Sequence, residues 1–177
     1  MAQLEQYNRE EEEDKLLMWT MNRIDAQPAF LRRANVKGYQ LNKEHSLDSV
    51  AELERYAREE RVTFEGKSEA AIRERQDCWF YLGELVRKNF GGSWEFSMDE
   101  KNDANWGEYV IEGAGPADVE FVPERLFRFF TLRGYPAGMM RTAVEYQGNP
   151  VDVDLSDLVA EQEAEDRAKG IVRRDDE

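Results

Sequence analysis

Glu84 is the residue in this sequence that is best placed for acid–base chemistry. It follows Gly83 in the middle of an apolar run, residues 78–86. A carboxylate beside a hydrophobic core can act as an acid or a base if burial raises its pKa. Arg87 and Lys88 follow at helical spacing and can pair with it. The favoured interpretation is an ion-paired or solvated Glu84, and an enzyme that uses carboxylates around Glu84 remains the alternative.

The remaining candidates for nucleophilic or metal chemistry are isolated. His45 is the single histidine, and without a second His or a nearby Cys it predicts a surface or capping role at a helix start rather than a metal site. Cys78 precedes Trp79 and Phe80, which indicates an inert core thiol. With one His, a serine hydrolase is disfavoured. We therefore expect no catalytic residue, no metal and no cofactor.

Gly113, Ala114 and Gly115 resemble part of a glycine-rich phosphate loop. The run lacks the Lys-Ser/Thr ending of such loops, and Pro116 leads it towards a strand rather than a helix. The segment is therefore a very weak nucleotide signal.

The strongest surface signal lies in residues 93–112. Large apolar and polar residues alternate there on both sides of a polar, turn-rich connection, which is typical of a hairpin with aromatics facing the helices and acids facing water. Aromatic side chains supply contact area at interfaces, and acids select the partner. A merely solvated sheet face is the alternative. We predict a partner-binding surface made of Trp106, Glu95, Asp99, Glu100, Asp103, Glu108 and Glu112.

Acidity is concentrated at the two ends of the chain. The net charge is −14; residues 1–14 hold six acids and one base, residues 150–177 hold ten acids and four bases, and the body between them is only slightly negative. A net-acidic surface without clustered bases and aromatics is a poor binder of nucleic acid. The acidic ends either serve as solvated extensions or steer a basic partner protein towards the body.

Periodicity and capping residues predict the order of the elements. The predicted helices cover about 5–25 (ended by Pro28), 46–61 (capped by Ser46), 68–90 (capped by Ser68 and stopped by Gly91 and Gly92), a helix opened by Pro123, and a weak helix at 155–169. Residues 137–147 are compatible with a short helix or an extended segment. The predicted strands are 93–98, 106–112 and 118–122.

These elements predict an α+β fold in which several helices, one long and central, pack on a small antiparallel sheet of three or more strands. Gly83 inside the long helix predicts that another strand or helix crosses there. The expected organisation is an acidic extension of the first helix at 1–14, a single domain at 15–150, and an acidic, partly helical or disordered segment at 151–177. One cysteine and no long apolar stretch predict a cytoplasmic protein that does not enter a membrane.

Residues 78–96 carry a resemblance to known proteins. Tyr-Leu-Gly-Glu at 81–84, followed by Gly-Gly-Ser-Trp at 91–94, is similar to a pattern of small uncharacterised bacterial proteins in which such a helix leads through a glycine turn into a strand. The segment 46–56 resembles the one that often precedes it. The resemblance covers about residues 41–130 and implies a fold more than an activity. Some proteins of this build occur beside toxin and immunity genes.

Together these observations favour a non-enzymatic protein that binds a basic partner, most concretely an immunity or antitoxin-like inhibitor of a partner such as a toxin. The alternatives are an acidic nucleic-acid mimic, which the near-neutral body disfavours, and the small carboxylate enzyme around Glu84.

Overall fold

The computed structural model describes residues 6–116, 119–134 and 136–149, which form an α+β fold of helices and a two-stranded antiparallel sheet. None of the helices in these ranges has a stretch long and apolar enough to cross a membrane. In chain order the elements are α1 (Arg9–Val36), α2 (Ser49–Glu59), α3 (Glu69–Phe90), β1 (Ser93–Phe96), the 3₁₀ helix η1 (Glu100–Asn105), β2 (Tyr109–Glu112), α4 (Pro123–Leu132) and α5 (Met139–Gly148).

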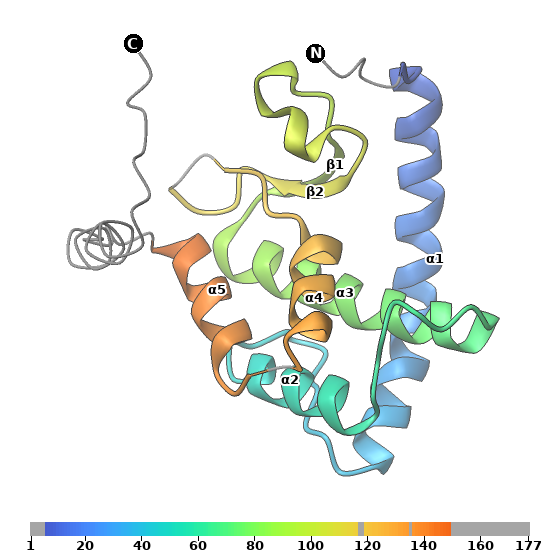
Figure 1. Cartoon of the computed structure of the whole chain (residues 1–177), viewed down its shortest axis with the longest axis vertical. Helices are drawn as coiled ribbons and strands as arrows, with labels where there is room; N and C mark the ends of the chain where they lie inside the picture. Colours follow the sequence, from blue (N-terminus) through green and yellow to red (C-terminus); the bar gives the residue numbers. More distant parts are fainter. Residues whose placement is uncertain (1–5, 117–118, 135, 150–177) are drawn as a thin grey trace, which may run out of the picture.

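Helix α3 runs through the middle of the molecule, with α1 along one side, α4 and α5 on another and α2 below it (Figure 1). Its start and end agree with the predicted signals: the Ser68 hydroxyl accepts a hydrogen bond from the backbone N–H of Ala71, and Gly91 ends the helix with φ 88°. The ten consecutive residues 77–86 are all buried. The prediction of a long central helix is therefore confirmed.

The prediction that Pro28 ends the first helix is wrong, because α1 continues through Pro28 to Val36. A proline inside a helix removes a hydrogen bond and costs about 3 kcal/mol. Beyond the proline, Phe30 is buried edge-on against Tyr56, with ring centroids 5.4 Å apart, and Ala34 is fully buried. Burying a phenylalanine contributes a gain of similar size, about 1.5–3 kcal/mol, so tertiary packing maintains the helix past the local break signal.

Ser46 was predicted to cap the second helix, but α2 begins three residues later, at Ser49. The Asn42 side chain bonds Ser46 instead: Asn42 Oδ1 accepts from the Ser46 backbone N–H at 3.1 Å, and Asn42 Nδ2 donates to Ser46 Oγ at 2.8 Å. Short polar side chains often form such local turns in competition with helix caps. Residues 42–48 are therefore a side-chain-stabilised turn before α2.

The sheet has two strands in the described residues rather than the three or more that were predicted. β1 and β2 pair in antiparallel register, with Trp94 opposite Ile111 and Phe96 opposite Tyr109. The segment expected as a third strand makes one isolated bridge, in which Phe121 and Ile111 exchange two backbone hydrogen bonds of 2.8 and 3.0 Å. Pairing stops there because Pro123 has no N–H to donate and begins α4.

Helix α4 begins at Pro123, as predicted. Residues 139–148 form helix α5, so the segment for which a short helix and an extended structure were both compatible is helical. The first turn of α5 is capped from another helix. The buried carboxylate of Glu54 in α2 accepts hydrogen bonds from the backbone N–H groups of Gly138 at 2.9 Å and Met140 at 3.0 Å. The weak helix predicted at 155–169 lies outside the described residues.

Gly83 was predicted to mark a crossing strand or helix, but the groups that approach it most closely are side chains. A Cβ atom on Gly83 would collide with the indole of Trp94 from β1, and it would lie 3.0 Å from Pro123 Cγ at the start of α4. Trp94 stacks on Phe80 of α3 with ring centroids 5.6 Å apart and packs edge-on against Trp19 of α1. Because Gly83 has no side chain, the sheet, α1 and α3 can pack together in one aromatic cluster.

Candidate functional site

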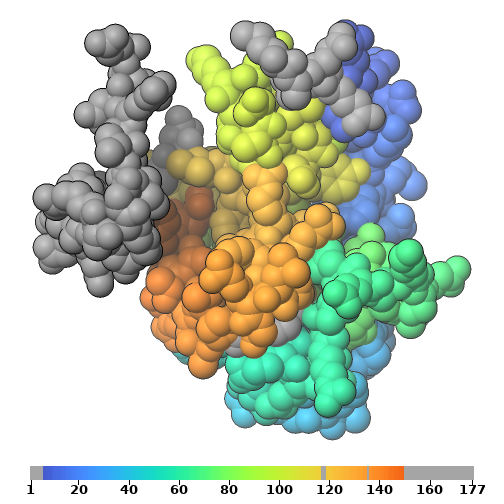
Figure 2. Space-filling view, in the orientation of Figure 1, coloured from blue at the N-terminus to red at the C-terminus, as the bar shows by residue number. Residues whose placement is uncertain are grey.

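The structure brings two acidic segments that are far apart in the sequence to the same end of the molecule. The 3₁₀ helix η1 and the residue before it carry Asp99, Glu100 and Asp103, all exposed, and the first turn of α1 carries Glu10 and Glu11. The hairpin loop and the start of α1 stand together at the top of the molecule (Figures 1 and 2). We call these five residues the acidic tip.

Tyr7, which the sequence did not single out, joins these two segments. Its ring packs edge-on against Phe96, with centroids 5.0 Å apart, and lies 6.5 Å from the ring of Trp106. A side chain at Gly107 would collide with Tyr7, so the glycine allows the contact. Trp106, a predicted site residue, is therefore half-buried beneath the segment that leads into α1. A tyrosine among polar residues gave no sequence signal of this long-range contact.

Two further residues that sequence reasoning missed hold the hairpin loop in one conformation. The carboxylate of Glu120 accepts hydrogen bonds from the side chains of Ser97 at 2.7 Å, Asn102 at 3.1 Å and Asn105 at 2.8 Å. Arg125 of α4 donates to Asn105 Oδ1 at 2.5 Å and also to the carbonyl of Ala104. A loop fixed by charge-assisted hydrogen bonds presents its acids with little ordering cost on binding.

The other predicted acids are not part of the tip. Glu108 forms an ion pair with Arg125 at 3.5 Å. Glu95 accepts a hydrogen bond from Ser93 Oγ at 2.8 Å, and Glu112, opposite Ser93 in the strand register, is exposed at the other end of the hairpin. The structure therefore divides the seven predicted residues into a group around η1, a paired Glu108, and two acids on the strands, the half-buried Glu95 and the exposed Glu112.

An apolar groove lies between α4 and α5, next to the residues that fix the hairpin loop. Its volume is about 580 Å³, and Glu120 and Arg125 are among the residues that line it. The rest of its lining comes from Phe121, Val122, Leu126, Phe129, Met139, Thr142, Ala143 and Tyr146. Exposed aromatics beside arginines are typical of protein interfaces.

Glu84 is buried and fully engaged in hydrogen bonds. Its side chain takes two hydrogen bonds of 2.9 Å from the guanidinium of Arg87, and Oε1 accepts a third of 2.9 Å from Trp94 Nε1. Burial alone would raise the pKa of Glu84, but these hydrogen bonds outweigh it and the pKa lies below its usual value. The predicted pairing with Arg87 is confirmed, and this carboxylate stays ionised and serves to link α3 to β1.

His45 is not on the surface, which corrects the prediction of a surface or capping role. The side chain is fully buried, and its ring stacks on Tyr81 with centroids 4.5 Å apart. Its Nε2 atom lies 2.8 Å from Gln27 Nε2, and Nδ1 lies 2.8 Å from the Lys43 carbonyl. Burial, followed by the positive charge of Lys88, lowers the pKa of His45 to about 4.

This shift predicts a pH-dependent stability that His45→Gln removes. The pKa of His45 in the folded protein lies below the unfolded value of 6.5. The contribution of the neutral His45 to the free energy of unfolding is therefore fully present above pH 6.5 and is lost as the pH falls towards 4. The loss amounts to at most about 3 kcal/mol. Urea unfolding of both proteins at pH 7 and pH 4.5 tests this, with the wild-type loss exceeding that of the variant. Equal losses would contradict a buried neutral His45.

Cys78 is fully buried, and burial raises its pKa well above the usual value, so the thiol is the inert core residue that was predicted. Within residues 6–116, 119–134 and 136–149, no three His, Cys, Asp or Glu side chains are arranged to hold a metal ion.

No protein-family model matches the chain, and neither a curated protein nor a solved structure does.

Proposed function

We propose that this protein is a non-enzymatic binding protein that occludes a basic partner protein, in the manner of an immunity or antitoxin protein. The observation that carries the proposal is that Glu120 and Arg125 both line the apolar groove between α4 and α5 and, through Asn105, hold the hairpin loop that carries three acids of the tip. Apolar grooves supply affinity, and a charged rim selects the partner and speeds its approach.

Within the described part of the chain, Glu11 of the tip pairs with Lys15 at 2.9 Å, whereas the three acids on the hairpin loop are uncompensated. Asp99, Glu100 and Asp103 form no ion pair there, whereas Glu108 nearby is neutralised by Arg125. Unpaired surface carboxylates on a fixed loop create a negative potential that reaches about 8–10 Å at physiological salt. A basic partner would be drawn towards this end of the molecule.

The groove would hold an apolar segment of the same partner. Its walls are two helices, α4 and α5, and its exposed side chains include Phe129, 41% exposed, and Tyr146, 53% exposed. A cleft between two helices with aromatic walls suits the apolar face of an amphipathic helix. The partner is therefore a protein with a basic surface next to an apolar stripe.

Neutralising the tip tests the electrostatic half of the proposal. The variant Asp99→Asn/Glu100→Gln/Asp103→Asn is expected to capture its partner from native lysate at least tenfold less well, and wild-type capture should weaken as salt rises. Mass spectrometry of eluates at low and high salt identifies the partner.

The matched control removes three acids elsewhere, by Glu44→Gln/Glu59→Gln/Glu65→Gln, and therefore has the same net charge as the tip variant. It should capture like the wild type. In the groove, Phe129→Ala should also reduce capture about tenfold. Equal capture by the tip variant and the control would refute the proposal, and release of a DNA-binding protein by added DNA would instead identify a nucleic-acid mimic.

A further inference from the structure

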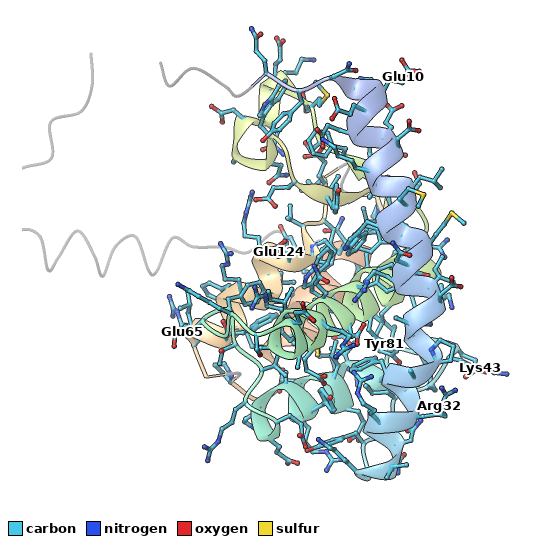
Figure 3. All side chains as sticks on the ribbon, turned by 90° about the vertical axis from the view of Figure 1, so that its right-hand side faces the viewer. Glu10, Arg32, Lys43, Glu65, Tyr81 and Glu124 are labelled. Atoms are coloured by element: carbon cyan, nitrogen blue, oxygen red, sulfur yellow. The ribbon has the colours of Figure 1, made fainter. Side chains whose placement is uncertain are left out.

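Helix α1 has an apolar outward face in its middle that no described element covers. Leu17, Met18, Met21 and Ile24 are 59, 60, 54 and 52% exposed, whereas Leu16 and Trp19, on the opposite side, pack into the core. Single exposed apolar side chains are ordinary, but a contiguous stripe on one helix marks an interaction surface. Figure 3 shows α1 along the edge of the molecule, with no other helix or strand on its outer side.

The stripe has the spacing of a helix–helix seam. Positions that alternate four and three residues apart share one face of α1, which is the pattern of a coiled coil. They are Glu10, Asp14, Leu17, Met21, Ile24, Pro28, Leu31 and Asn35. The seam is thus apolar in the middle and polar at both ends, and α1 is about 42 Å long.

The charges beside the seam favour one orientation of a partner helix. The first half of α1 carries Glu10 and Asp14 on this face, while the second half carries Arg32; Figure 3 shows Glu10 and Arg32 towards opposite ends. Asp14 and Arg32 form no ion pair within the described ranges. An antiparallel copy of α1, centred between Met21 and Ile24, brings Asp14 to the level of Arg32 on its partner.

We propose that the occupant of this face is a second copy of this chain, bound through antiparallel packing of the two α1 helices about a twofold axis. Each copy then supplies the same patch, so one Asp14–Arg32 pair forms on each side of the axis. A parallel arrangement would set acids against acids. The groove between α4 and α5 takes no part in this dimer, and the residues tested below, Asp14, Met21 and Arg32, lie outside the acidic tip.

The apolar part of the seam is short, so the dimer is expected to be weak, with a Kd of about 1–100 µM. Sedimentation equilibrium of the full chain between about 1 and 300 µM should show a reversible monomer–dimer equilibrium. Met21→Glu should raise the dissociation constant at least tenfold, whereas Met139→Glu, at an exposed methionine position in the groove, should leave it unchanged. Circular dichroism checks that both variants remain folded.

A charge exchange tests the antiparallel orientation. Asp14→Arg and Arg32→Asp alone should each weaken the dimer severalfold at low salt, and the double variant should restore it, because the exchanged charges again face opposite charges. A wild-type chain that remains monomeric at 300 µM would overturn the proposal. A dimer whose dissociation constant is unchanged by Met21→Glu would also overturn it. The same holds if the double variant dimerises more weakly than both single variants.

Discussion

Replacing Asp77 with Ala is expected to destabilise the protein by about 3–5 kcal/mol, because it leaves a buried arginine without its partner. The Asp77 side chain is 3% exposed and joins α3 to α1 through two arginines: Arg23 Nη1 donates to Oδ1 at 3.1 Å and Arg33 Nη2 donates to Oδ2 at 3.0 Å. The Arg23 side chain is 15% exposed, and its Nε already lacks a partner among the described residues. Urea denaturation of Asp77→Ala measures the loss.

The pKa of Asp77 indicates what the ion pair contributes. Burial raises it, and the hydrogen bond from Arg33 and the charge of Arg23 do not fully oppose that rise. The charged form is therefore costly in place, so removing both buried partners should be much milder than removing one. Asp77→Leu/Arg23→Met is expected to recover most of the stability that Asp77→Ala loses. A double variant as unstable as Asp77→Ala would show that the pair itself stabilises the fold.

The sequence predicted those elements whose signals are local. Helix α3 has its cap at Ser68, its stop at Gly91 and an apolar stripe between them, and each of these acts within a few residues. The strands β1 and β2 follow from alternation in the same way. Features that depend on distant segments were not predictable: α1 passes Pro28 because Phe30 packs against Tyr56, which belongs to another helix.

The same distinction applies to the site. The acids of η1 were predicted from composition and position, but their union with the start of α1 depends on Tyr7, which packs on Phe96 about 90 residues away in sequence. In the sequence, His45 is a polar residue at the start of a predicted helix. Its stacking on Tyr81 in the structure shows that it is a core residue. Local patterns thus identified the charged groups, and long-range packing decided which of them lie together.

The aromatic cluster around Gly83 gives a second large effect, which a double-mutant cycle can isolate. Trp94→Ala is expected to cost about 3–5 kcal/mol, because the indole packs on Trp19 and Phe80 and its Nε1 donates to Glu84. Gly83→Ala normally stabilises a helix interior by about 1 kcal/mol. Here the new Cβ would collide with the Trp94 ring, so a loss of about 1–3 kcal/mol is expected instead.

The sign of the Gly83→Ala effect should therefore depend on Trp94. In a Trp94→Ala background the ring is gone, and Gly83→Ala should stabilise by up to about 1 kcal/mol, which gives an interaction energy of about 2–4 kcal/mol between the two sites. A Trp106→Ala background serves as the control, since Trp106 lies against Tyr7 at the acidic tip, and there Gly83→Ala should remain destabilising. Chemical denaturation of the variants measures the cycle. Equal destabilisation by Gly83→Ala in both backgrounds would contradict this prediction. The steric clash of the new Cβ would then be with Pro123 at the start of α4, and the glycine would be required for the packing of α3 on α4 rather than on the sheet.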